Sequence, residues 1–128
     1  MRTFTSIFAS LMLVLVAACS NADGGKDITS AELVSRIRDN SAPVILDVRS
    51  EQEYQAGHVP GAVNVPLGDH QETLASLGLA KNSEVVVYCQ SGRRAKKMVD
   101  FMQQQGFSEV RHLQGDMGGW RAEKLPAE

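Results

Sequence analysis

One cysteine lies where a predicted strand gives way to a predicted helix. Residues 85–88 are three valines and a tyrosine, a run that is typical of a strand buried on both faces. Cys89 follows them, and beyond a short loop with Gly92 the apolar residues recur at helical spacing from Ala95 to Met102. Unpaired N–H groups and the positive end of a helix dipole meet at such a junction and stabilise an anion, including a cysteine thiolate. This spacing predicts that the Cys89 pKa is lowered into the range where the thiol is ionised at neutral pH.

Charged residues end a neighbouring predicted strand. Residues 44–48 are apolar apart from Asp47, and Arg49 follows them directly. The carboxyl ends of parallel strands meet at one edge of a sheet, and ligands bind outside that edge. We therefore expect Asp47 and Arg49 to lie on the same edge as Cys89.

Strands and helices are expected to alternate along the chain. Thr29 and Glu32 fit a capping box that opens a first helix, and Gly106 is placed to end the helix that follows Cys89. The pattern predicts strands over 44–48, 62–65, 85–88 and 110–113, and further helical segments over 49–56, 69–77 and 94–105. This order predicts a single α/β domain with a mainly parallel sheet.

Size and charge narrow the class of protein. The chain has 128 residues and a formal net charge of −2 at pH 7, which becomes −3 if Arg2 is removed with residues 1–18. The 110 residues that would remain are enough for one domain around one core. Mild acidity argues against a nucleic-acid partner and against a polybasic membrane patch. No feature of the sequence indicates an oligomer, so a monomer is expected.

Residues 1–18 have the pattern of a secretory signal peptide. An arginine precedes an apolar run over 7–18 that is too short to span a bilayer as a stable helix. Small residues then lead into Cys19, which resembles the lipobox of bacterial lipoproteins; in that family the cysteine is acylated and becomes the first residue of the mature chain. The alternative is an ordinary signal peptide cut near Ala18 or Ala22. Both patterns predict export.

The lipoprotein pattern also predicts how the mature chain is organised. Cys19 would carry the lipid, the polar and glycine-rich residues 19–26 would form a flexible tether, and residues 27–126 would form the domain. The membrane would be contacted through the N-terminal lipid only. Ser20, rather than an aspartate, after the cysteine favours the outer membrane in a Gram-negative host, so a periplasmic or cell-surface lipoprotein is expected.

The two cysteines leave one free thiol. With Cys19 acylated, Cys89 would have no partner for an internal disulfide in a compartment where disulfides form. A lone thiol in an exported protein is either buried and inert or kept for chemistry.

Three motifs carry a resemblance to a known family. Residues 89–94, C-Q-S-G-R-R, resemble the active-site loop C-x-x-G-x-R of the rhodanese family, the thiosulfate sulfurtransferases. Residues 47–62 resemble that family's second signature, D-x-R-x-x-x-E-[FY]-x-x-G-H-[IV]-P-G-A, in order and spacing. Residues 113–120 are similar to its C-terminal motif, except that Asp116 interrupts the usual paired glycine. The resemblance extends over residues 27–122.

The resemblance implies a fold and a reaction. The fold would be a single domain with a five-stranded, mainly parallel sheet and helices on both faces. The Cys89 thiolate would attack the outer sulfur of thiosulfate or a similar small-molecule donor, sulfite would leave, and a thiol or cyanide would take the sulfur from a Cys89 persulfide. A thiolate is both a nucleophile and a leaving group, as this two-step transfer requires. No cofactor is expected, and His70 and His112 show no metal-ligand spacing with Cys89.

The resemblance also implies roles for the residues of the loop. Backbone N–H groups of the loop would hold the anionic sulfur. Arg94 is expected to brace the loop through a carboxylate such as Asp47 or Glu53, or else to contact substrate, and Arg93 to reach substrate or solvent. The substrate-binding loop would comprise Gln90, Ser91, Gly92, Arg93 and Arg94.

Residues outside the loop are expected to be structural. Asp47, Arg49 and Glu53 would brace the loop, with Arg49 and Glu53 forming an ion pair at the strand end. His58 is expected to pack and hydrogen-bond near Pro60 and Gly61 rather than to act as a base. Trp120 is expected in the core or in a pocket wall.

Three other functions are weighed against sulfur transfer. A non-catalytic module that carries or binds sulfur fits the same loop. A cysteine-dependent phosphatase or an arsenate reductase fits less well, because those phosphatases place an arginine six residues after the cysteine, where this chain has Ala95. A thiol–disulfide oxidoreductase would need a C-x-x-C pair, which the sequence lacks.

Overall fold

Four parallel strands form the sheet of the computed structural model, which describes residues 27–128. The expected signal peptide, the expected lipidation site Cys19 and the expected tether lie outside the described residues. Each strand pairs in parallel with its neighbour, so the carboxyl ends of all four lie at one edge of the sheet. The sheet order is β2-β1-β3-β4, with β1 Val44–Asp47, β2 Val63–Asn64, β3 Glu84–Tyr88 and β4 Glu109–His112.

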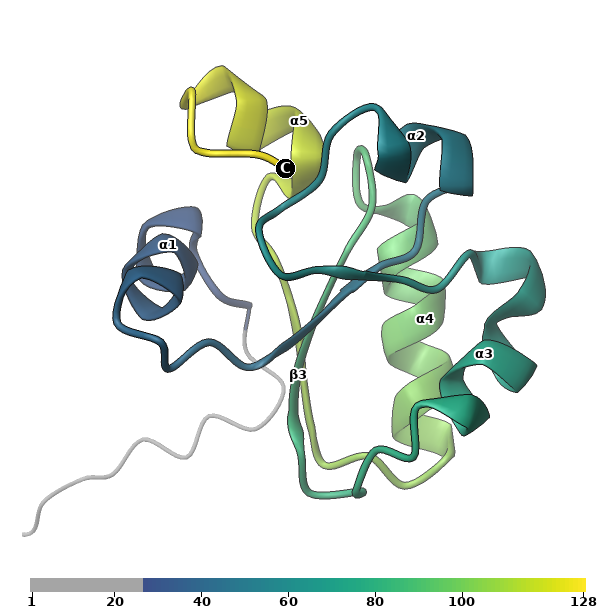
Figure 1. Cartoon of the computed structure of the whole chain (residues 1–128). Helices are drawn as coiled ribbons and strands as arrows, with labels where there is room; N and C mark the ends of the chain where they lie inside the picture. The colour runs from purple at the N-terminus through teal and green to yellow at the C-terminus, as the bar shows by residue number, and fades with distance from the viewer. Residues whose placement is uncertain (1–26) are drawn as a thin grey trace, which may run out of the picture.

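Helices lie on both faces of this sheet. One face is covered by α3 (His70–Ser76) and α4 (Arg93–Gln104), and the other by α1 (Ser30–Arg38) and α5 (Asp116–Ala122) (Figure 1). Two short segments, α2 (Glu51–Gln55) and η1 (Leu67–Asp69), follow β1 and β2. The predicted α/β fold with helices on both faces is confirmed.

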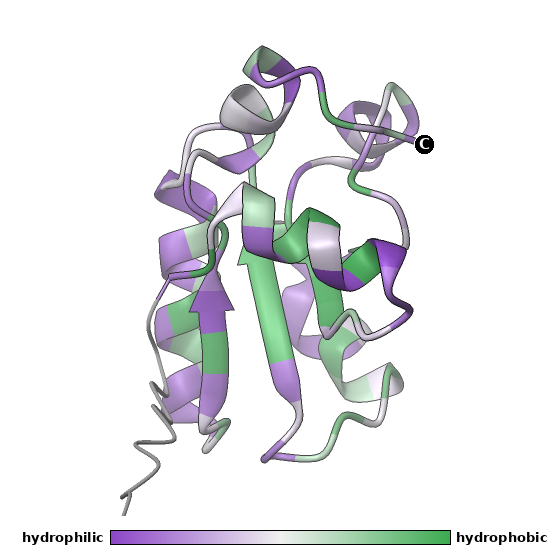
Figure 2. Cartoon of the chain, turned by 90° about the vertical axis from the view of Figure 1, so that its left-hand side faces the viewer, coloured by the Kyte–Doolittle hydropathy of each residue, from purple (hydrophilic) through white to green (hydrophobic). Residues whose placement is uncertain are grey.

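The strand β3 contributes side chains to two hydrophobic cores, one on each face of the sheet. Its side chains alternate between the faces, so Val85 and Val87 pack in the cluster with α3 and α4, whereas Val86 and Tyr88 pack in the cluster with α1 and α5. All four side chains are fully buried. Figure 2 shows β3 in the hydrophobic colour beyond its first residue, while the helices alternate between the two colours. A strand covered on both faces explains the unbroken apolar run in the sequence.

The expected fifth strand is reduced to a single bridge. Ile28 lies beside β4, where its N–H donates to the His112 carbonyl and its carbonyl accepts from the Gln114 N–H, both at 2.9 Å. Thr29 then accepts a hydrogen bond from the Glu32 N–H at 3.1 Å and starts α1. Because the helix begins at once, no strand can continue from Ile28 toward the C-terminus. The prediction of five strands is wrong for the described residues, which contain four.

The C-terminal segment packs onto the domain. The backbone of Glu128 exchanges two hydrogen bonds with that of His58, at 2.9 and 3.0 Å, so the packed chain continues beyond residue 126. Trp120 is fully buried, and its Nε1 donates to the Pro126 carbonyl at 2.8 Å, which makes it a core residue. Within residues 27–128, no helix combines the length and the apolar character needed to cross a membrane.

Candidate active site

The Cys89 sulfur lies among main-chain N–H groups directly after β3. Its Sγ atom accepts hydrogen bonds from the N–H groups of Gly92, at 3.0 Å, and Ala95, at 3.4 Å. The α4 helix begins at Arg93, so the Ala95 group is one of the N–H groups that a helix leaves unpaired in its first turn. Cys89 is 1% exposed and is the free cysteine of the described chain. This arrangement suits a negatively charged sulfur.

Gly92 forms the turn that brings these groups together. Its φ angle is 108°, in the region that favours glycine. A Cβ atom at this position would lie 3.1 Å from Oδ2 of Asp116, closer than side chains normally approach. Both the backbone and the available space therefore require glycine here.

Arg94 links the loop to α2. Its Nη1 and Nη2 atoms donate to the two carboxylate oxygens of Glu53 at 2.6 and 3.1 Å. The hydrogen bond from Arg94 is the main reason that the pKa of Glu53 is lowered to about 2. Glu53 also completes a capping box with Ser50, which fixes the start of α2. The structure thus places Arg94 on Glu53, one of its two expected partners, in a geometry that braces the loop.

Asp47, Tyr88 and Arg49 form a buried cluster of hydrogen-bonded polar side chains near the same edge of the sheet. The Tyr88 hydroxyl donates to Asp47 Oδ2 at 2.7 Å and accepts from the Val59 N–H at 3.1 Å. Burial, and then the hydrogen bond to Asp47, raise the pKa of the Tyr88 hydroxyl. Nε and Nη2 of Arg49 donate to the Asp47 carboxylate, with a shortest distance of 2.7 Å. Arg49 is 1% exposed, so this ion pair lies inside the protein.

The expected ion pair between Arg49 and Glu53 does not form. Arg49 folds back onto the carboxylate two residues before it, and its Nη2 also donates to the Gly57 carbonyl at 2.7 Å. Glu53 is held by Ser50 and Arg94 instead. That prediction is wrong because spacing along the chain does not give the direction in which each side chain leaves the backbone.

The outer side of the loop is polar and cationic. Gln90 is half-buried, and its carbonyl accepts from the Gly118 N–H at 3.1 Å. Positive side chains close to the sulfur raise the local potential for an anionic substrate. The exposed residues of the loop and of the first turns of α4 are Ser91, Arg93, Lys96 and Lys97.

Asp116 contacts the main chain of Cys89, although the sequence assigned it no role. Its Oδ1 atom accepts from the Cys89 N–H at 3.0 Å and from Nε2 of His112 at 2.9 Å. The hydrogen bond to Asp116 is the main reason that the pKa of His112 is raised. The signal in the sequence was the broken glycine pair, which marked the position but not the contact.

Comparison with known proteins identifies the family of this site. Residues 29–123 match the family described as the rhodanese-like domain, which is most of the chain. The chain belongs to the rhodanese-like domain family. The match contains the Cys89 loop together with Asp47 and Glu53, so the residues that surround the sulfur lie within the matched range.

Relatives of this rhodanese-like domain include named sulfurtransferases. The chain is 33% identical over 101 residues to the putative sulfurtransferase YtwF of Bacillus subtilis, covering 79% of this chain and 95% of that protein. It is 36% identical over 70 residues to the thiosulfate sulfurtransferase PspE of Escherichia coli, covering 55% of this chain and 67% of that protein. Some other curated relatives are about twice as long, and the chain spans 53% and 50% of two of them.

A solved structure with the same fold is that of the Alr3790 protein from Anabaena sp. It is 31% identical, with a TM-score of 0.71 over 79% of this chain and 81% of that chain. The rhodanese-like fold of the described residues is therefore shared with a structure determined independently.

The histidines of this rhodanese-like domain make local contacts. His58 stacks on Tyr54, with ring centroids 3.7 Å apart, and its Nδ1 atom contacts the Tyr54 carbonyl at 2.9 Å, so it packs against α2. His70 Nδ1 contacts the Leu67 carbonyl. Among residues 27–128, no group of three or more histidine, cysteine, aspartate or glutamate side chains is arranged to hold a metal ion.

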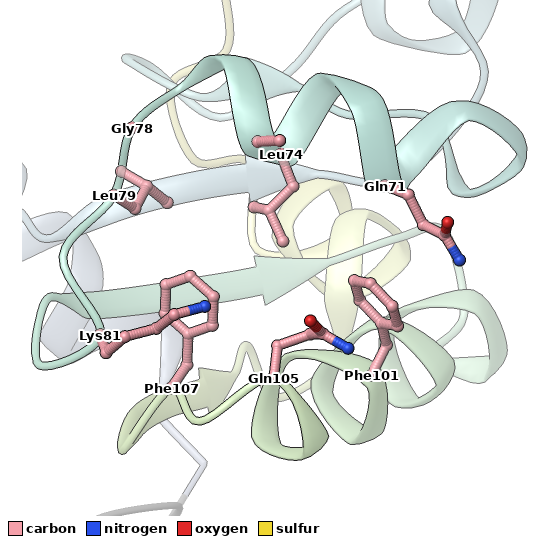
Figure 3. Close-up of a pocket in the computed structure, with 9 residues that line it drawn as sticks. Gln71, Leu74, Gly78, Leu79, Lys81, Phe101, Gln105 and Phe107 are labelled. Atoms are coloured by element: carbon pink, nitrogen blue, oxygen red, sulfur yellow. The ribbon is translucent and has the colours of Figure 1, made fainter.

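A groove of about 240 Å³ lies between α3 and the C-terminal half of α4 (Figure 3). Lys81 lies along its edge, with Nζ 4.2 Å from the ring centroid of Phe107. Cys89 is at the opposite end of α4, so this groove is separate from the thiol. The groove is lined mainly by Leu74, Leu79, Lys81, Phe101, Gln105 and Phe107.

Proposed function

We propose that this rhodanese-like domain takes a sulfane sulfur from thiosulfate, or a similar donor, onto Cys89 and passes it to a thiol or cyanide. The observation that carries this proposal is the Cys89 sulfur in hydrogen-bond contact with two main-chain N–H groups at the N-terminus of α4. Relatives named sulfurtransferases support it.

The first half-reaction loads the cysteine. The Cys89 thiolate attacks the outer sulfur of thiosulfate, a new S–S bond forms, and the S–S bond of thiosulfate breaks. Sulfite leaves with the electron pair of the broken bond, and the persulfide keeps the negative charge on its outer sulfur. No proton is transferred, so no general base is required.

The second half-reaction returns the cysteine to its starting state. A thiolate or cyanide attacks the outer sulfur of the persulfide, and Cys89 leaves as a thiolate. Negative charge therefore returns to Sγ, where the Gly92 and Ala95 N–H groups are already in place to bind it. Arg93, Lys96 and Lys97 supply positive charge on the exposed side for an anionic donor.

The loop supports sulfur transfer over phosphate transfer. Arg94 binds Glu53 through both terminal nitrogens, so its guanidinium is engaged by a carboxylate of the protein itself. Position 95 is an alanine whose N–H contacts Sγ. A shorter loop of this kind leaves less room for a tetrahedral phosphate than for a single sulfur atom.

Steady-state formation of thiocyanate from thiosulfate and cyanide tests this function. We expect turnover in the wild-type chain and none in Cys89→Ser. Hydrolysis of an aryl phosphate that depends on Cys89, without thiocyanate formation, would instead support a phosphatase.

The proposal for location rests on the sequence. The lipobox-like residues before Cys19 support export and lipid attachment at that cysteine, which would hold the domain at a membrane surface in the periplasm or outside the cell. The donor and acceptor would then be small molecules that reach that compartment.

A further inference from the structure

Three hydrogen bonds join the Cys89 loop to the first turn of α5. The Cys89 N–H donates to Asp116 Oδ1 at 3.0 Å, and the Cys89 carbonyl accepts from the Met117 N–H at 2.9 Å. One residue further on, the Gln90 carbonyl accepts from the Gly118 N–H at 3.1 Å. The peptide units on both sides of the nucleophile are therefore fixed by residues 116–118.

The Asp116 carboxylate is itself held in one position. The residue is 3% exposed, and the oxygen that binds Cys89 also accepts from Nε2 of His112 at 2.9 Å. That hydrogen bond raises the pKa of His112. A buried carboxylate with two donors on one oxygen is well fixed.

The same pair of side chains packs against the loop at Gly92. A Cβ atom built on Gly92 would lie 3.1 Å from Oδ2 of Asp116 and 3.6 Å from Cε1 of His112. The N–H of Gly92 is the nearer of the two groups that donate to Cys89 Sγ. Asp116 and His112 thus contact the loop at the nucleophile and at the turn that carries its closest donor.

The backbone at position 116 does not by itself explain an aspartate. Its φ angle is 53°, in the left-handed region, which glycine adopts without the steric cost that other residues incur. An aspartate is therefore strained where a glycine would not be. The hydrogen bonds that its carboxylate makes to Cys89 and His112 explain why an aspartate is present at this position.

We propose that Asp116, oriented by His112, is a positioning residue for sulfur transfer at Cys89. It holds the Cys89 N–H and the Gly92 turn so that the N–H groups of Gly92 and Ala95 remain on Sγ. Charge is present on Sγ before thiosulfate is attacked and again when the acceptor removes the outer sulfur, so both half-reactions depend on this alignment. The inference rests on the proposed function, because it concerns the same thiol.

Two substitutions at position 116 separate the carboxylate from the backbone. Asp116→Gly relieves the strain and removes the carboxylate, whereas Asp116→Asn keeps an oxygen acceptor. Lys124→Gly is the matched control, since Lys124 also has a φ of 53° but is exposed and follows the C-terminal end of α5. The maximal single-turnover rate of persulfide formation and the half-saturating thiosulfate concentration are measured by mass spectrometry, together with the thermal midpoint.

We expect Asp116→Gly to fold and to load sulfur about tenfold more slowly or worse, because small misplacements are costly in a preorganised site. Its thermal midpoint should stay near that of wild type, since relief of the backbone strain at position 116 offsets the loss of the acceptor for the buried Cys89 N–H. Its half-saturating thiosulfate concentration should stay within about twofold of wild type, since the Asp116 carboxylate binds the loop and not the donor. Asp116→Asn should recover most of the rate, and Lys124→Gly should behave as wild type. An Asp116→Gly variant with the wild-type rate, or an Asp116→Asn variant as slow as Asp116→Gly, overturns the proposal.

Amide hydrogen exchange gives a second readout that needs no sulfur donor. The Gly92 and Ala95 amides should exchange faster in Asp116→Gly than in wild type, and unchanged exchange overturns the proposal. If the wild-type chain gains no sulfur from thiosulfate, the proposed function fails, and the exchange comparison alone decides the role of Asp116.

Discussion

At the residue scale, the Cys89 sulfur is bound by main-chain N–H groups and not by charged side chains. Two N–H groups lie within 3.4 Å of Sγ, whereas Arg94 is bound to Glu53 and Arg93 is exposed. Donors fixed by secondary structure do not have to reorganise when charge develops on the sulfur. Changes to the loop backbone should therefore cost more activity than removal of one arginine charge.

Gly92→Ala tests this backbone arrangement. The φ of 108° and the 3.1 Å approach to Asp116 Oδ2 both oppose a methyl group. We expect the free energy of unfolding to fall by about 1–3 kcal/mol in urea titrations. Thiocyanate formation should fall at least about tenfold. Gly119→Ala is the control, because a Cβ there meets nothing within 4 Å; wild-type turnover in Gly92→Ala would contradict the arrangement.

Tyr88 should matter for stability and not for sulfur transfer. Its hydroxyl bridges the Asp47 carboxylate and the Val59 N–H inside the protein. Tyr88→Phe leaves the Val59 N–H without that acceptor, and we expect the free energy of unfolding to fall by about 1–3 kcal/mol. The rate of persulfide formation should be unchanged; a slower rate at unchanged stability would show that Tyr88 acts on the site.

At the element scale, the strand β3 and the helix α4 that follows it can be predicted directly from the sequence. The apolar run of residues 85–88 requires a strand covered on both faces, and the helical spacing after Gly92 places the apolar side chains of α4 on the sheet. Together they put Cys89 at the junction, which is where the structure has it. Local periodicity is sufficient to predict this part of the site.

Tertiary contacts were harder to predict for a physical reason. The contact between Glu53 and Arg94 depends on how α2 is placed against α4, and the contact between Arg49 and Asp47 depends on the direction of the two side chains; spacing encodes neither. The hydrogen bond from Cys89 to Asp116 joins residues 27 apart in sequence. The resemblance suggested five strands, but the early start of α1 at Ser30 leaves only the Ile28 bridge.

The contact between α2 and α4 predicts a pH dependence of stability. The pKa of Glu53 is lowered from 4.5 to about 2, so the ionised carboxylate favours the folded state. This contribution to the free energy of unfolding is fully present above 4.5, the pKa of Glu53 in the unfolded chain. It is lost as the pH falls toward about 2, the pKa of Glu53 in the folded protein. Both side chains are more than a third exposed, so we expect about 1 kcal/mol or less.

Glu53→Gln measures that contribution. The variant should be less stable than wild type near neutral pH, and the difference in the free energy of unfolding should narrow as the pH falls below 4.5. Glu51→Gln removes the same charge from the first turn of α2 without a contact to Arg94. A difference for Glu53→Gln that stays constant with pH would contradict the Arg94 contact.

At the scale of the whole molecule, two hydrophobic cores position Cys89. Cys89 packs in the cluster with α3 and α4, and its neighbour Tyr88 packs in the cluster with α1 and α5. The loop is thus attached to a strand that is buried on both sides. This explains how a loop with several exposed residues can hold its amides in a fixed orientation.

The proposal for the N-terminus is tested on the full chain. Cys19→Ser should lose incorporation of a labelled fatty acid and leave the membrane fraction, since a lipid on Cys19 is the proposed attachment. Cys89→Ser is the control and should keep both the label and the membrane association. A Cys19→Ser chain that keeps its label and still fractionates with membranes would contradict lipidation at this cysteine.

The most direct measurement of sulfur transfer is the mass of the folded domain after treatment with thiosulfate. We predict a gain of one sulfur atom, located on Cys89 by peptide mapping, which cyanide then removes. Cys89→Ser should gain none. A wild-type domain that acquires no sulfur at Cys89, or that acquires sulfur which cyanide leaves in place, would contradict a persulfide intermediate at this site.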